Sequence, residues 1–326
     1  MHRFIRTSAA TAVAASVVVS FAGSVQAADE LNVGYFLEWA TPNMIAKVDG
    51  AYEDALGIPV NWTTFATGTA MTEAMLAGDL DIAYSQGLAP FINAINANAP
   101  LVVAAIAVQY PANDCYVRND AGIDKTNASE LEGQAVAVPL ATMADYSFRM
   151  MMREFDVDVS AIDVVDQEPA DGAVALADGN VAMACVFGGL AEASSAEVGT
   201  PIMTLEEKDA AGIISFDVVS VTEAFAQEEP DLVRAFLEVT SEANANFTGS
   251  DEQLEKLASE SGLSVDAVKK QMETFVFPTT EQQLTEYFNA DGVASAAIKV
   301  VGDAFATEES PARDDYESAI DTSFME

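Results

Sequence analysis

The sequence predicts an α/β protein of two lobes, each built on a doubly wound, mostly parallel sheet. Apolar segments of strand length alternate with amphipathic segments of helical length from residue 31 to residue 221, which is typical of such sheets. In addition, the order glycine, polar residue, apolar strand, turn and helix at 78–87 returns 101 residues later, at 179–188. We therefore expect two lobes of similar construction, followed by a helical C-terminal tail.

The first lobe begins with strands predicted at 31–36, 60–65, 80–84 and 101–108. Helices are expected at 43–56 and 69–76, because Pro42 suits a helix start and Gly78 suits the left-handed residue after a helix end. Residues 85–87 would then form a turn between a strand and a helix. Such turns expose backbone N–H groups and are common ligand sites in open α/β sheets.

The second lobe repeats this pattern, with strands expected at 114–118, 134–139 and 162–166 and within 179–187, and helices at 140–155 and 172–176. A return strand at 215–221 leads to tail helices at 230–245, 252–259, 265–274, 280–289 and 293–306. We place lobe one at residues 28–112 and 218–326 and lobe two at residues 113–217. Two crossing strands between the lobes would form a hinge.

The N-terminus has the features of a signal peptide. Arg3 and Arg6 precede an apolar run at 9–22, and Val25-Gln26-Ala27 suits cleavage after Ala27. No later segment approaches the roughly 20 continuous apolar residues that a membrane span requires. We therefore expect residues 1–27 to be removed and the rest of the chain to be exported.

The charge is strongly acidic: 52 Asp and Glu face 14 Lys and Arg, a formal net charge of −38. Such a field repels nucleic acid and anionic membranes, so we expect neither as a partner and interpret the charge as a solubility adaptation to a saline habitat. The only histidine is His2, inside the predicted signal peptide. Ser-His-Asp and Cys-His catalysis and histidine metal ligation are therefore excluded, and we expect no enzyme activity, metal or cofactor. Cys115 and Cys185 are the only cysteines, and a disulfide and two buried thiols are equally compatible with the sequence.

Four motifs indicate a family: NVGY at 32–35, AGDLDI at 77–82, LEGQAVAVP at 131–139 and FDVV at 216–219. With the signal peptide, they resemble the periplasmic solute-binding proteins of taurine and alkanesulfonate ABC importers, above all the taurine-binding branch. The resemblance implies a type II periplasmic-binding-protein fold that closes on its solute. It also implies a monomer that hands the solute to a membrane permease.

The same resemblance suggests which residues hold the solute. Ser85, Gln86, Thr142 and Tyr146 match positions where the family presents hydroxyls and amides to the sulfonate, and neutral donors suit this weakly basic anion. A hydroxyl that only caps a helix is the main alternative, above all for Thr142. Among the few cations, Arg118 is the candidate for a cleft residue.

The resemblance assigns the ammonium group of taurine to Asp217. A carboxylate desolvated by closure needs a cation partner, and Asp217 interrupts an apolar strand. Glu38 and Asp114 are second candidates for this role, although solvated or structural acids are common at such positions.

Aromatic residues near the predicted turns complete the expected site. Trp39 and Phe187, like Tyr146, are candidates for its wall, although such rings also form lobe cores. Phe187 stands where the taurine branch has Trp, and Ala66 where it has Asp. Two or more rings around one Asp would form a cation box. The alternative ligands on this fold are therefore an alkanesulfonate, a quaternary amine or a pyrimidine precursor.

Overall fold

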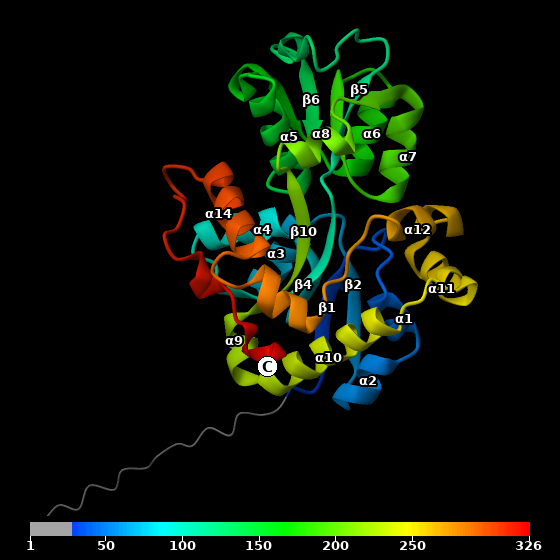
Figure 1. Ribbon diagram of the computed structural model, residues 1–326, viewed down its shortest axis with the longest axis vertical. Coiled ribbons are helices and arrows are strands. Elements are labelled where there is room, and N and C mark those ends of the chain that lie inside the picture. The colour runs from blue at the N-terminus through cyan, green and yellow to red at the C-terminus, as the bar shows by residue number, and fades with distance from the viewer. Residues whose placement is uncertain (1–27) are drawn as a thin grey trace, which may run out of the picture.

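The computed structural model describes residues 28–326, and the predicted signal peptide at 1–27 lies outside them. Within this range the chain forms two five-stranded sheets, each surrounded by its own helices (Figure 1). No helix among the described residues is long and apolar enough to cross a membrane. The predicted α/β fold with two lobes is confirmed.

The first sheet contains, in spatial order, β2 (Val60–Thr64), β1 (Leu31–Tyr35), β3 (Ile82–Gly87), β10 (Ile214–Thr222) and β4 (Leu101–Pro111). Strand β1 is parallel to β2 and β3, whereas β10 is antiparallel to β3 and β4. Its helices are α1 (Asn43–Val48), α2 (Ala51–Leu56), α3 (Gly68–Ala77), α4 (Leu88–Asn96), α9 (Glu223–Glu228), α10 (Pro230–Asn246), α11 (Asp251–Ser261), α12 (Val265–Met272), α13 (Thr280–Gln282) and α14 (Val293–Phe305).

The second sheet contains β7 (Asp163–Asp166), β6 (Ala135–Val138), β8 (Met183–Val186), β5 (Asp114–Arg118) and β9 (Gly199–Pro201). Its helices are α5 (Met143–Glu154), α6 (Pro169–Ala177), α7 (Gly189–Val198) and α8 (Leu205–Ala210). The repeated sequence pattern has a structural counterpart, because β3 and β8 are both central and both lie between a parallel and an antiparallel neighbour.

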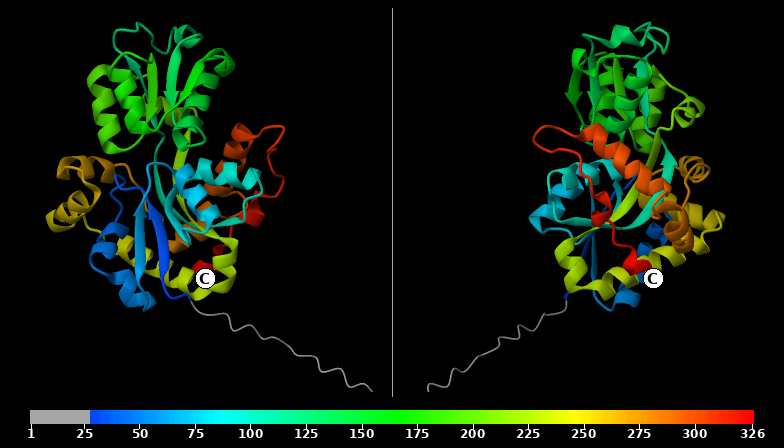
Figure 2. Two further views of the ribbon diagram at one scale, coloured as in Figure 1. Left: turned by 180° about the vertical axis from the view of Figure 1, so that it is seen from behind. Right: turned by 60° about the vertical axis from the view of Figure 1, so that its left-hand side comes forward.

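The chain passes between the sheets twice, from β4 to β5 through Ala112 and Asn113, and again just before β10. Figure 2 shows both passages from behind, with the second sheet standing above the first. Strand β10 pairs with β4 along its whole length, so the boundary that we propose after residue 217 falls inside a strand of the first sheet. We propose that the two passages form the hinge.

Several expected elements have different bounds, and two of these differences have a clear physical cause. The helix expected at 43–56 is divided, because Gly50 adopts a left-handed φ of 72° between α1 and α2. The strand expected at 80–84 instead spans Ile82–Gly87, because pairing with β10 extends it. Ser85 and Gln86 therefore belong to a strand and not to a turn.

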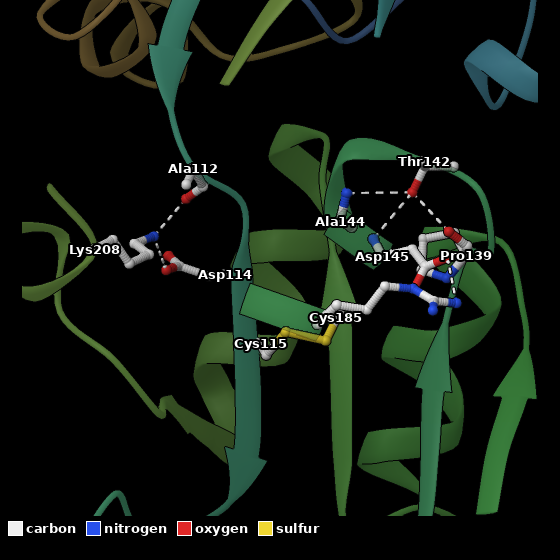
Figure 3. The surroundings of a disulfide bond; sticks show 10 residues. Ala112, Asp114, Cys115, Pro139, Thr142, Ala144, Asp145, Cys185 and Lys208 are labelled. Atoms are coloured by element: carbon white, nitrogen blue, oxygen red, sulfur yellow. Dashed lines mark hydrogen bonds and ion pairs between the residues drawn. A yellow bond between two sulfur atoms is a disulfide. The ribbon is translucent and has the colours of Figure 1, made fainter. Parts of the chain in front are cut away.

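Cys115 and Cys185 form a disulfide across the second sheet (Figure 3). The two residues face each other on the antiparallel strands β5 and β8, with their Cα atoms 3.9 Å apart. Both are almost fully buried. The structure thus decides between the two states that the sequence left open.

Replacing both cysteines by serine is expected to lower the free energy of unfolding by about 2–4 kcal/mol, because the bridge constrains the unfolded chain. The closed loop is long, since the cysteines are 70 residues apart. Urea unfolding would measure the loss, and unmodified protein kept in reductant should also unfold at a lower midpoint than the oxidised protein. An unchanged midpoint would contradict a stabilising bridge.

Candidate binding site

A cavity of about 40 Å³ lies between the two lobes, with room for roughly three water molecules. The first lobe supplies side chains from β3, β4, β10 and the segment after β1, and the second lobe supplies them from the start of α5 and the end of β8. The residues used below are Phe36, Trp39, Ser85, Tyr110, Asn113, Thr142, Met143, Phe187 and Asp217. Of the described residues that line this cavity, none is a lysine or arginine.

Among the described residues of the lining, Asp217 is the only carboxylate, and its side chain is held from two sides. The Ser85 hydroxyl donates to Oδ2 at 2.7 Å, and the Tyr110 hydroxyl donates to Oδ1 at 2.8 Å. Asp217 is only 5% exposed, and burial raises its pKa to about 7 although both hydrogen bonds lower it. No described residue of the lining places a cation beside this carboxylate, so its ionised form would attract an arriving cation.

The backbone around Ser85 is unusual. Ser85 has a φ of 60°, in the left-handed region that few non-glycine residues adopt. The pairing of β3 with β10 is irregular just beyond Val218, next to Asp217. Strain of this kind often marks a functional position, and here it accompanies the bond from Ser85 to Asp217.

Four aromatic rings form a continuous wall of the cavity. Centroid distances are 5.5 Å for Phe187 to Phe36, 5.9 Å for Phe36 to Trp39, and 4.8 Å for Trp39 to Tyr110. Trp39 and Phe187 were expected to line the site, whereas Phe36 and Tyr110 were not. The wall contains rings from both lobes, so it is complete only when the lobes are together.

The hydroxyls expected to bind an anion are already engaged. Thr142 donates to the Pro139 carbonyl at 2.6 Å and accepts from the backbone of Ala144 and Asp145, so it caps α5 (Figure 3). Ser85 donates its proton to Asp217. Trp39 is one of the lining residues, and its indole N–H is buried without a hydrogen-bond partner in the described structure. Gly68, the first residue of α3, also lines the cavity, and it lies at the helix end where N–H groups lack partners within the helix.

Two expected residues lie in the core behind the cavity. Gln86 is fully buried, donates to Thr72 and Gly68, and accepts from Ser220. Tyr146 is buried on α5, and burial raises the pKa of its hydroxyl. Gln86 thus ties β3 to α3 and β10, which fixes the strand that carries Ser85.

Three further charged candidates also lie outside this lining. The Glu38 carboxylate accepts the backbone N–H of Leu190. Asp114 pairs with Lys208, whose ammonium also donates to Ala112 in the crossing segment (Figure 3). Arg118 pairs with Asp120. Asp114 and Lys208 line a second cavity of about 560 Å³, which shares Trp39, Tyr110 and Asn113 with the first.

Two lobes, each with its own sheet, around an interlobe cavity have the architecture of the type II periplasmic-binding-protein fold. The chain belongs to the NMT1/THI5-like family, whose model matches residues 40–254. It is 24% identical over 256 residues to a taurine-binding periplasmic protein of Escherichia coli (strain K12), covering 76% of this chain and 78% of the relative.

Solved structures share the fold. The aliphatic sulphonate-binding protein SsuA of Escherichia coli superposes with a TM-score of 0.61 at 22% identity, covering 79% of this chain and 90% of SsuA. The alkanesulfonate-binding protein SsuA of Xanthomonas axonopodis pv. citri, bound to MOPS, gives a TM-score of 0.68 at 16% identity, covering 90% and 98%. These three relatives are binding proteins. Among residues 28–326, no group of three or more His, Cys, Asp or Glu side chains could hold a metal ion.

Proposed function

We propose that this protein is the periplasmic receptor of an ABC importer and binds taurine or a close aminosulfonate in the interlobe cavity. Closure at the hinge would then present the loaded form to the membrane permease. The observation that carries the proposal is the buried Asp217, which has no cation beside it. The taurine-binding relative and the sulfonate-binding structures support the choice of an aminosulfonate.

The ammonium end of the solute is assigned to Asp217. Each carboxylate oxygen already accepts one hydrogen bond and has a free lone pair for another. The adjacent rings of Tyr110 and Trp39 present further electron density to a cation. An ammonium group would therefore be both paired and partly enclosed.

The sulfonate end is assigned to the neutral donors of the lining. A sulfonate is a weakly basic anion that hydrogen-bond donors and helix N-termini can hold without a counter-charge. The indole N–H of Trp39 and the start of α3 at Gly68 are available for this role. Ser85 and Thr142 then act mainly by fixing Asp217 and the start of α5, and Phe187 covers the solute from the second lobe.

A quaternary amine is the second candidate, because four rings line a cavity with one carboxylate. Calorimetry with taurine, ethanesulfonate and tetramethylammonium separates the two. We expect taurine to bind at micromolar or lower Kd and ethanesulfonate about 100-fold more weakly, because only taurine can pair with the buried carboxylate. Equal or tighter binding of ethanesulfonate would refute the zwitterion assignment. Binding of tetramethylammonium alone would favour the amine receptor.

A further inference from the structure

We propose that Glu38 is a positioning residue that holds the two lobes together over the solute and slows its escape. This inference rests on the proposed function as a receptor that closes on its solute. It assigns Glu38 no direct contact with the solute, because its side chain lies outside the cavity lining.

The contact itself joins the two lobes. Glu38 follows β1 in the first lobe, and its Oε2 accepts the backbone N–H of Leu190 at 2.9 Å. Leu190 is the second residue of α7, a helix of 10 residues in the second lobe. The N–H groups of a first helical turn lack partners within the helix and carry the positive end of its dipole. The Glu38 carboxylate, from the other lobe, accepts one of these N–H groups and places a negative charge at the positive end of the dipole.

The backbone around Glu38 is held in place within the first lobe, so the hydrogen bond to Leu190 links the two lobes through a fixed point. The side-chain amide of Gln271 on α12 donates to the Glu38 carbonyl at 2.9 Å and accepts from the Ala40 N–H at 3.1 Å. The segment 38–40 is therefore clamped to α12 from behind. Glu38, fixed in lobe one, therefore holds the start of α7 in lobe two.

The two glycines that precede Leu190 allow the second lobe to come close to Glu38 and its neighbours in the first lobe. Gly188 has a φ of 90°, and a Cβ there would lie 3.1 Å from the Glu38 carboxylate oxygen. A Cβ on Gly189 would lie 2.9 Å from a methyl group of Leu263 in the first lobe. Two consecutive glycines thus leave room for the lobes to meet at this point.

The bond also aligns the wall of the cavity. Phe36 lies two residues before Glu38 and Trp39 directly after it, and Phe187 lies two residues before the start of α7. Phe36 and Phe187 meet edge to face across the interlobe boundary at 5.5 Å. Loss of the Glu38 contact would therefore separate rings that both line the cavity.

The test compares Glu38→Ala and Glu38→Gln with Glu255→Ala, an exposed glutamate on α11 of the same lobe. Tryptophan fluorescence in a stopped-flow instrument follows taurine release. We expect Glu38→Ala to release taurine about tenfold faster at a nearly unchanged association rate, because a hydrogen bond to a charged group is lost. Glu38→Gln should recover part of the loss, since its amide oxygen still accepts, and Glu255→Ala should match the parent protein.

Small-angle X-ray scattering of the solute-free proteins tests the same inference without any ligand. We expect a larger radius of gyration for Glu38→Ala than for the parent and the Glu255→Ala control. An unchanged radius together with an unchanged release rate would overturn the proposal. An unchanged radius with complete loss of binding in both Glu38 variants would also overturn it, in favour of direct solute contact. If the parent protein failed to bind taurine, the proposed function would fail, while the scattering comparison would still decide the role of Glu38.

Discussion

Asp217→Asn is expected to weaken taurine binding by at least about 100-fold, because an uncharged amide cannot pair with the buried ammonium group. The substitution preserves the shape of the side chain. One hydroxyl, of Ser85 or of Tyr110, can still donate to the amide oxygen, and the other can rotate to accept from the new amide N–H, so the cavity should keep its form. Calorimetry at pH 8 measures the loss directly.

The same variant should be more stable than the parent in the absence of solute. Burial raises the pKa of Asp217 from 3.8 to about 7, so the ionised carboxylate destabilises the folded state. This cost grows as the pH rises from about 4 to about 7 and is complete above it, where it reaches about 4 kcal/mol. Thermal unfolding should therefore show a gain for Asp217→Asn at pH 8 and almost none at pH 4.

Asp163→Asn is the matched control, since Asp163 is an exposed residue on β7 of the second lobe. It should change neither binding nor the pH profile of stability. Full binding by Asp217→Asn would show that the solute does not place a cation at this carboxylate. Loss of binding together with a lower melting temperature at pH 8 would point to damage to the cavity instead.

The fold could be predicted in advance because its signals are local. The alternation of strands and helices and the glycine that ends α3 depend on neighbouring residues. The arrangement of the site, in contrast, depends on pairing between strands that are far apart in the sequence. Strand β3 reaches Gly87 only because β10 pairs with it, and Tyr110 meets Asp217 only because β4 runs beside β10. No local pattern marks either contact.

The resemblance to a family named Asp217 and Phe187, and the predicted turn after the first strand indicated Trp39; all three line the cavity. It could not show how the hydroxyls are used, because a hydroxyl near a turn can cap a helix or face a solute. Thr142 illustrates the first case, and Ser85 donates to a carboxylate instead. The contact of Glu38 with α7 joins residues 152 positions apart and depends on the approach of two lobes. Sequence periodicity carries no information about such an approach.

The affinity for taurine is expected to fall about tenfold for each pH unit below 7 and to level off near pH 8. The free carboxylate of Asp217 has a pKa of about 7, whereas an ammonium partner binds only its ionised form. Binding at pH 6 must therefore release close to one proton. Calorimetry at pH 6 in two buffers of different ionisation enthalpy measures that number.

Glu192, on α7 beside the second cavity, needs separate control, because burial also raises its pKa to about 7. Titration of Glu192 persists in Asp217→Asn, whereas the proton release assigned to Asp217 should vanish there. The sign of the pH effect also identifies the solute's group at this carboxylate. A neutral Asp217 could donate a hydrogen bond to a sulfonate oxygen, and the affinity would then rise as the pH falls. Weaker binding in acid therefore places the ammonium at Asp217, and tighter binding in acid would place the sulfonate there.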